Sequence, residues 1–172
     1  MISVKSRTFQ AFLLPMLLVL LQSCGFYSFT GASISPAVET ISIIPFPNNA
    51  PLVQPTLSQE FTNALKEKFT SQTNLALVNR DGDLNIEGEI TGYSTQPVAI
   101  QGNEQAALNR LTISVKVRFT NTVEEARSFE STFTRFEDYP SSQSLSAVEE
   151  SLIQQINEAL VEDIFNRAVV NW

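Results

Sequence analysis

Hydrophobic and polar positions alternate most clearly in the middle of this 172-residue chain. Between residues 84 and 91 every second residue is apolar or glycine, and the residues between them are polar. The same alternation recurs in 111–120 and 129–134. A period of two places side chains on two faces of a sheet, so these segments predict strands with one buried and one solvent-exposed face. Phe136 interrupts the last alternation, which predicts a β-bulge or the end of that strand.

Two shorter strands are predicted nearer the N-terminus, at 38–43 and 75–78. The first ends at Pro45, because proline has no N–H for a sheet hydrogen bond. The pair Asp81-Gly82 is a typical hairpin turn and predicts that the strand at 75–78 pairs with the one that follows it. Two segments rich in turn residues, 45–55 and 94–107, are predicted to be loops.

Two stretches show the 3.6-residue period of amphipathic helices. The first begins after Thr56 and ends near Ser71, and the second begins at Ser146 and covers about 24 residues. Thr56 and Ser146 each stand three residues before a Gln or Glu, a spacing that predicts a capping box at each helix start. The apolar stripe of the second helix consists of Val148, Leu152, Ile156, Leu160 and Ile164.

The order of these elements is strand, helix, several strands and a long helix. A sheet with one dry face needs one covering layer, and two amphipathic helices can supply it. The sequence therefore predicts an α+β two-layer sandwich, with two helices packed on one face of a mostly antiparallel sheet of about four to five strands.

The N-terminus has the pattern of a bacterial export signal. Lys5 and Arg7 precede a short apolar run at 11–21, which is too short to cross a membrane, and Ser23 precedes the single cysteine, Cys24. The pattern resembles a lipobox, which implies an acylated Cys24 that anchors the protein to a membrane. A buried free thiol is the alternative. We expect a signal peptide at 1–23, a lipidated tether at 24–37 and a single domain at 38–172.

The composition of the chain argues against several classes of function. The chain carries 11 basic and 18 acidic side chains and no histidine. The acidic balance argues against nucleic acid as a partner, because nucleic-acid binding depends on clustered Lys and Arg. Without histidine or a second cysteine, the usual zinc sites and the Ser-His-Asp and Cys-His arrangements are excluded. We therefore expect no cofactor, no metal and no catalysis.

Three cations share the polar face of one predicted strand: Arg110, Lys116 and Arg118. Charge-assisted hydrogen bonds to phosphate need such a local cluster, so these residues are the candidate contact with an anionic lipid. The alternative is an ordinary solvated sheet face. The carboxylates Glu87 and Glu89 lie on the polar face of another strand and are predicted to be solvated surface.

Several segments together resemble one known family. They are residues 24–29, 41–47, 55–58, 82–93, 109–112 and 163–172. The chain resembles the lipopolysaccharide-assembly lipoprotein (LptE) family. The resemblance implies an outer-membrane lipoprotein that assists assembly of, and plugs, the β-barrel translocon that inserts lipopolysaccharide into the outer leaflet. It implies a barrel subunit as partner and leaves open whether lipopolysaccharide itself is bound directly. A generic periplasm-facing lipoprotein scaffold, unrelated to lipopolysaccharide, is the alternative.

Overall fold

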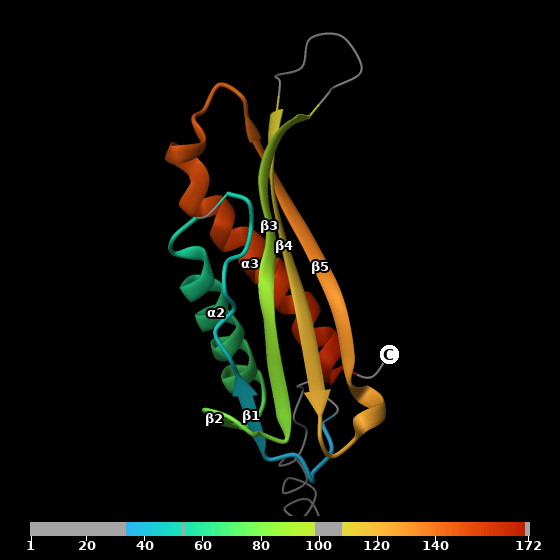
Figure 1. Ribbon diagram of the computed structural model, residues 1–172. Helices are drawn as coiled ribbons and strands as arrows, with labels where there is room; N and C mark the ends of the chain where they lie inside the picture. The colour runs from blue at the N-terminus through green and yellow to red at the C-terminus, as the bar shows by residue number, and fades with distance from the viewer. Residues whose placement is uncertain (1–33, 53, 99–107, 171–172) are drawn as a thin grey trace, which may run out of the picture. The chain divides into compact units, whose positions relative to one another are not determined.

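The computed structural model describes residues 34–52, 54–98 and 108–170. These residues form two helices packed on one face of an open five-stranded mixed sheet (Figure 1). The sheet order is β2-β1-β3-β4-β5. The strands are β1 (Thr40–Ile43), β2 (Ala76–Val78), β3 (Leu84–Val98), β4 (Leu108–Asn121) and β5 (Phe129–Pro140). The helices are α2 (Leu57–Gln72) and α3 (Leu145–Val169), and one 3-10 turn, η1 (Glu125–Arg127), precedes β5. The predicted α+β fold is confirmed.

The three long strands β3, β4 and β5 form an antiparallel meander, with β4 in the middle. The odd-numbered residues of β4 from Leu111 to Phe119 are buried under the helix layer, while Lys116 and Arg118 are exposed on the opposite face. The predicted division into a dry and a wet face is therefore correct. We call the wet, helix-free side the open face of the sheet.

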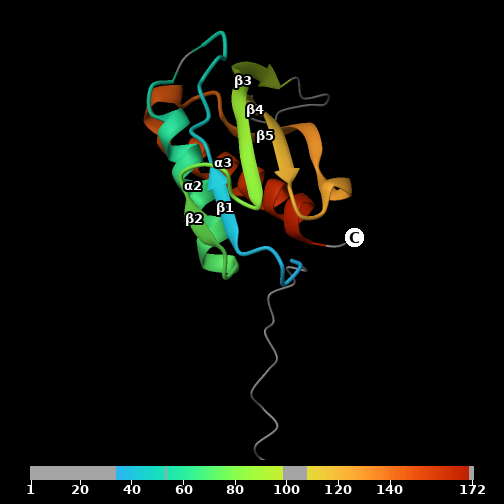
Figure 2. The ribbon, with the colours of Figure 1, turned by 60° about the horizontal axis from the view of Figure 1, so that its bottom comes forward.

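Both helices lie on the same side of the sheet (Figure 2). Their buried apolar residues belong to the hydrophobic core. In α3, Leu152, Ile156, Leu160 and Ile164 are buried as predicted. The two helices also pack on each other, because the rings of Phe69 and Phe165 meet edge to face with centroids 5.1 Å apart. Under the loop before α2, Phe46 and Phe61 make a second such contact at 5.1 Å. The first contact fixes the two helices against each other, and the second fixes α2 against the loop that precedes it.

The predicted hairpin at Asp81-Gly82 is wrong. Strands β2 and β3 both pair in parallel with β1, which lies between them. The connection 79–83 crosses the start of β1, where one carboxylate oxygen of Asp83 accepts hydrogen bonds from the backbone N–H groups of Glu39 and Thr40, each at 2.9 Å. These bonds lower the pKa of Asp83, the Glu39 bond most strongly. The turn residues were identified correctly, but local sequence does not say which strand is the neighbour.

The long strands extend further than the sequence predicts. Residues 94–98, expected in a loop, continue β3, while 99–107 lie outside the described residues. Phe136 neither ends β5 nor marks a bulge: the strand continues to Pro140 in unbroken register, with Phe136 48% exposed on the open face. The irregularity lies instead in β3, between Ile90 and Gly92.

Both predicted capping boxes are wrong as well. Neither helix has a side-chain hydrogen bond from its N-cap, and α3 begins at Leu145, with Ser144 as its N-cap. At the start of α2 the side chain of Gln54 accepts the N–H groups of Thr56 and Leu57 instead. The side chain of Glu149, expected to serve the first turn of α3, accepts a hydrogen bond from the hydroxyl of Tyr93. Burial and this bond raise the pKa of Tyr93, and the contact ties α3 to β3.

Candidate functional site

The proposed lipidation residue, Cys24, lies outside the described residues, as do the expected signal peptide and most of the tether. Within the described ranges, no helix is both long enough and apolar enough to span a membrane. The candidate site that the structure can describe is therefore the charged part of the open face.

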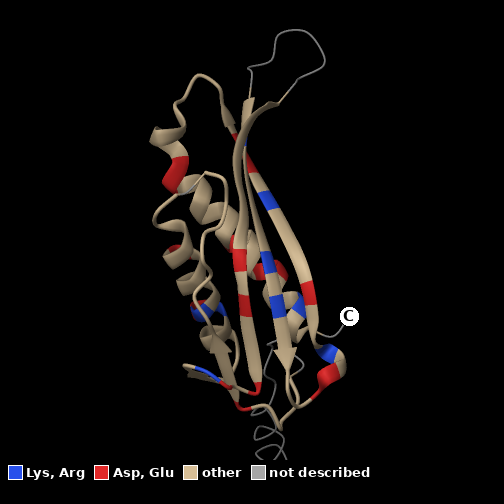
Figure 3. Cartoon of the chain, viewed as in Figure 1, with Lys and Arg blue, Asp and Glu red and all other residues tan. Residues whose placement is uncertain are grey.

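Charged residues of opposite sign stand side by side on three adjacent strands (Figure 3). Register places Glu87 of β3 opposite Arg118 of β4, and Arg118 opposite Glu130 of β5. Arg118 donates to Glu87 at 3.2 Å and to Glu130 at 3.1 Å, and Lys116 donates to Glu130 at 2.6 Å. Glu130 is thus the carboxylate that both cations share. We call Glu87, Lys116, Arg118 and Glu130 the open-face network.

The pKa values in the open-face network shift in the directions that pairing predicts. The hydrogen bond to Glu130 is the main cause of the raised pKa of Arg118. The pKa of Glu130 is lowered, first by its hydrogen bond to Lys116 and then by Arg118. All of these side chains are largely solvated, so the pairs are screened and contribute little to stability.

A shallow hollow of about 340 Å³ lies beside the open-face network. Its walls include Ile44 and the two prolines Pro45 and Pro47 on one side, and the charged residues of the network on the other. Gly88 lies at its base, where β3 and β4 approach so closely that an added Cβ would overlap the carbonyl oxygen of Lys116 and lie 2.6 Å from the ring of Phe46. Only glycine fits there without a backbone shift. The hollow therefore offers two cations beside an apolar rim.

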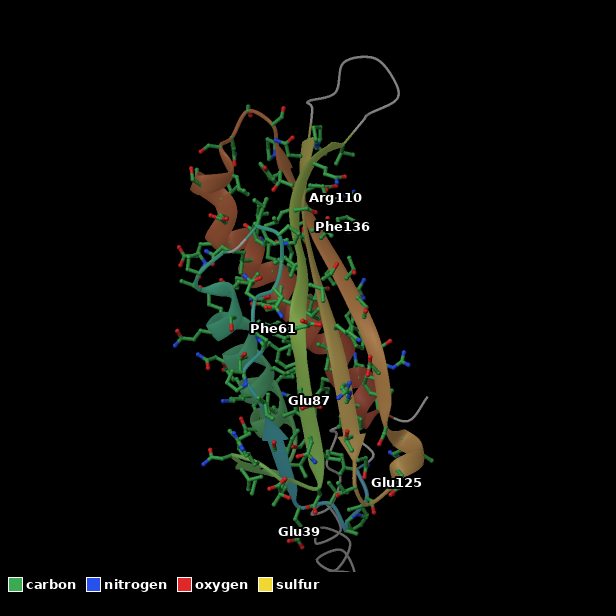
Figure 4. All side chains as sticks on the ribbon, in the orientation of Figure 1. Glu39, Phe61, Glu87, Arg110, Glu125 and Phe136 are labelled. Atoms are coloured by element: carbon green, nitrogen blue, oxygen red, sulfur yellow. The ribbon has the colours of Figure 1, made fainter. Side chains whose placement is uncertain are left out.

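Arg110 is separate from the other two predicted cations. It lies six residues before Lys116 on β4, roughly 20 Å away along the strand. Its guanidinium makes a two-pronged ion pair with Asp138, at 2.7 and 2.9 Å, and stacks 3.6 Å over the ring of Phe136 (Figure 4). The hydrogen bond to Asp138 raises the pKa of Arg110.

The structure thus brings Lys116 and Arg118 together and leaves Arg110 at the other end of the strand. Arg135, the fourth cation of this region, pairs with Asp163 of α3 at 2.6 Å and so belongs to the helix-covered side. Sequence reasoning missed Glu130, and it predicted Glu87 to be solvated surface without its partner Arg118. Only the register of three strands reveals these pairs, and a single sequence does not contain that register.

The chemistry available here is ionic recognition. Among the described residues, no group of three or more His, Cys, Asp or Glu side chains is placed to hold a metal ion. The open-face network can exchange one carboxylate for another anion, because guanidinium and ammonium groups bind phosphate and carboxylate through the same charge-assisted hydrogen bonds.

The chain is similar to several solved structures of other proteins. A hypothetical protein of Chlamydia trachomatis is 9% identical, with 78% of this chain and 99% of that chain covered and a TM-score of 0.53. A Xanthomonas campestris protein of the DUF330 family is 15% identical, with 79% and 91% covered and a TM-score of 0.51. The rare lipoprotein B of Shewanella oneidensis is 11% identical, with 75% and 90% covered and a TM-score of 0.49. The first two likenesses define the class of fold.

The family is shown by the sequence itself. The model of the LptE family, described as lipopolysaccharide-assembly, matches residues 38–168. The chain belongs to this family, as the sequence resemblance predicts, and the family assigns it generally to the lipoproteins of lipopolysaccharide assembly. A search of the curated proteins finds no match.

Proposed function

We propose that this protein is an outer-membrane lipoprotein that assists the assembly of the β-barrel translocon for lipopolysaccharide and plugs it. The observation that carries the proposal is the family match over residues 38–168, which includes both helices almost entirely and all five strands. The partner is the barrel subunit, and the protein acts by packing rather than by turnover. The absence of histidine from the sequence and the single cysteine support this non-catalytic role, since the common acid–base and nucleophilic arrangements need those residues.

The anchor is the acyl group on Cys24, left at the N-terminus after removal of residues 1–23. Residues 24–37 then tether the domain to the membrane. Cleavage before Cys24 leaves 172 − 23 = 149 residues, with 11 − 2 = 9 basic and 18 acidic side chains. Such an acidic chain gains little from anionic headgroups, so the acyl chains supply the membrane attachment.

The anchor is tested with Cys24→Ala. We expect no palmitate incorporation, together with unprocessed precursor or release of the protein from the outer-membrane fraction. Persistent labelling of the variant would refute acylation at this residue, whatever the function of the domain.

Direct contact with lipopolysaccharide is proposed for Lys116 and Arg118, with Arg110 as a separate contact. A lipid phosphate at the hollow would compete with Glu130 for both cations and would face Glu87 and Glu89 nearby. The apolar rim of Ile44, Pro45 and Pro47 is suited to the lipid portion next to that phosphate. In the same way, Arg110 would bind a lipid phosphate in place of Asp138.

The contact is tested by lipopolysaccharide binding to the purified protein. We expect Lys116→Ala/Arg118→Ala to bind more weakly, and Arg110→Ala to reduce binding further. The matched control is Lys66→Ala/Arg80→Ala, which removes the same two charges from α2 and the 79–83 connection. Equal loss of lipopolysaccharide binding in both double variants would mean that the open-face network is an ordinary solvated surface.

The barrel function is tested by depletion. We expect the mature barrel subunit and surface lipopolysaccharide to fall together. Normal levels of both would favour the generic lipoprotein scaffold unrelated to lipopolysaccharide.

A further inference from the structure

Helices α2 and α3 enclose a groove between their solvent-facing sides. The groove has a volume of about 740 Å³, and side chains of both helices line it. Its lining residues recur at three- and four-residue spacing on each helix, from Glu60 to Ser71 on α2 and from Glu150 to Glu162 on α3. The groove therefore follows both helices for about three turns, roughly 17 Å.

The groove is strongly acidic. Five glutamates line it, Glu60, Glu67, Glu150, Glu158 and Glu162, against a single cation, Lys68. Lys68 already binds Glu162 at one end and holds the pKa of that carboxyl below its usual value. Among the described residues, Glu60, Glu67, Glu150 and Glu158 have no ion-pair partner, and Glu158 accepts only the amide of Gln154, at 3.0 Å. Most of the negative charge of this surface is therefore not compensated by other side chains that the structure describes.

A buried amide also lines the groove. Asn157 of α3 is only 4% exposed, and its side-chain oxygen has no hydrogen-bond partner in the ranges 34–52, 54–98 and 108–170. Asn157 does not belong to the apolar stripe that the sequence predicts for this helix, and it is nevertheless buried. A buried acceptor without a donor costs free energy, and Asn157 belongs to the groove lining, so a small shift of its side chain would present this oxygen to an entering donor.

These observations favour a cationic hydrogen-bond donor as the occupant. A phosphate would meet five carboxylates and is excluded by charge. The groove does not offer a binding site for a divalent ion, because no three carboxylates of the described residues are placed to hold a metal ion. A guanidinium or ammonium group satisfies both the acids on the walls and the acceptor at Asn157.

We propose that the groove between α2 and α3 is a docking surface for a polypeptide segment that carries Arg or Lys side chains. Acids on both walls along three helical turns match a chain that presents successive cations, with one of them donating to Asn157. This surface is distinct from the open face, where the proposed lipopolysaccharide contact lies, and the inference does not depend on that contact.

The test measures binding of defined probes to the full, lipidated chain in detergent at about 150 mM salt. The probe is an octapeptide of alternating arginine and serine. Spermine, which carries the same number of positive charges, tests whether a small polyamine is the occupant. An octapeptide of alternating glutamate and serine tests whether binding requires a positively charged ligand. We expect the arginine peptide to bind at least about tenfold more tightly than spermine, and to shift the side-chain amide signals of Asn157 in nitrogen-15 spectra.

Two charge-matched triple variants locate the binding. Glu60→Gln/Glu67→Gln/Glu158→Gln should weaken peptide binding about tenfold or more, because it removes three carboxylates from the walls. Glu39→Gln/Glu125→Gln/Glu137→Gln removes the same charge elsewhere and should weaken it less than about twofold. Asn157→Leu should keep the fold, because the two side chains are similar in size, and should reduce peptide binding through loss of the acceptor.

The proposal is overturned if both triple variants weaken binding equally, since the peptide would then only sense net charge. It is also overturned if the signals of Asn157 do not move, or if spermine binds as tightly as the peptide.

Discussion

The open-face network and the α2–α3 groove are both rich in charged side chains. In the network, side chains of opposite charge are paired, whereas in the groove acidic side chains predominate. The hollow beside the network has three acids and two bases, and its cations alternate with carboxylates across three strands. The groove has five acids and one base, and most of its acids have no cation partner in the part of the chain that the structure describes. Strand pairing places each open-face cation directly opposite a carboxylate, whereas the helix stripes bring acids together. A cluster of cations on a strand is therefore a poor indicator of a free anion site, because the neighbouring strands can neutralise it.

The first prediction tests the difference between the two faces of the sheet, and its effect is the largest. Ile156 is fully buried between α3 and the sheet. Ile156→Asp should lower the free energy of unfolding by at least about 3 kcal/mol, because an unpaired carboxylate would be buried. Thr134→Asp on the open face is the control and should change it little. The measurement is chemical denaturation, and a near-native stability of Ile156→Asp would contradict the role of α3 as the cover of the sheet.

The second prediction concerns the base of the hollow. Gly88→Ala should destabilise the protein by about 1–3 kcal/mol, because its Cβ overlaps the backbone of Lys116 and forces the two strands apart. Gly92→Ala is the matched control on the same strand, since its Cβ would lie 3.2 Å from the side chain of Ser114 and needs only a small adjustment. Equal melting temperatures for the two variants would show that β3 and β4 can separate without cost at Gly88.

The two predictions rest on features that the sequence reveals to different degrees. The dry face of the sheet follows from alternation in β4 and from the four-residue spacing of the α3 stripe, so the helix-covered core was predictable. The position of β1 between β2 and β3 was not, because parallel pairing depends on contacts distant in sequence, such as those of Asp83. The same reason hid Glu130 from the candidate site.

The third prediction uses the connection that crosses β1. Asp83 has a pKa below its ordinary value of 3.8 because the backbone of Glu39 and Thr40 donates to it. Its stabilising contribution is therefore complete above the pKa of the unfolded chain and is lost as the pH falls through the lower, folded value. Asp83→Asn should lower the melting temperature at neutral pH by roughly 3–4 °C and weaken its dependence on acid pH.

Asp81→Asn is the control for this prediction. Asp81 has a φ of 54°, a conformation that Asn also adopts, so this variant should melt like the natural protein. If the melting temperature of Asp83→Asn depended on acid pH in the same way as that of the natural protein, Asp83 would not contribute to the acid dependence of stability.

The fourth prediction has the opposite sign and concerns the groove. Asn157→Leu should raise the free energy of unfolding by about 1 kcal/mol, because it removes a buried acceptor that has no donor within the described chain. Asn63→Leu, at another groove position, is the control and should give no such gain. A destabilised Asn157→Leu would mean that the amide is satisfied in the folded protein, and it would weaken the argument for a docking partner.

The smallest effect on stability is expected at Glu130, where the comparison of the two charged surfaces is most direct. Glu130→Gln removes the carboxylate shared by Lys116 and Arg118. Because all three side chains are well solvated, the melting temperature should change by no more than about 2 °C. Lipopolysaccharide binding should nevertheless increase, since both cations lose their competing carboxylate, and Glu125→Gln in η1 should leave it unchanged. If Glu130→Gln binds lipopolysaccharide no better than Glu125→Gln, then internal pairing is not what limits the open-face network. The two cations would then contribute only to the cross-strand pairs of the sheet.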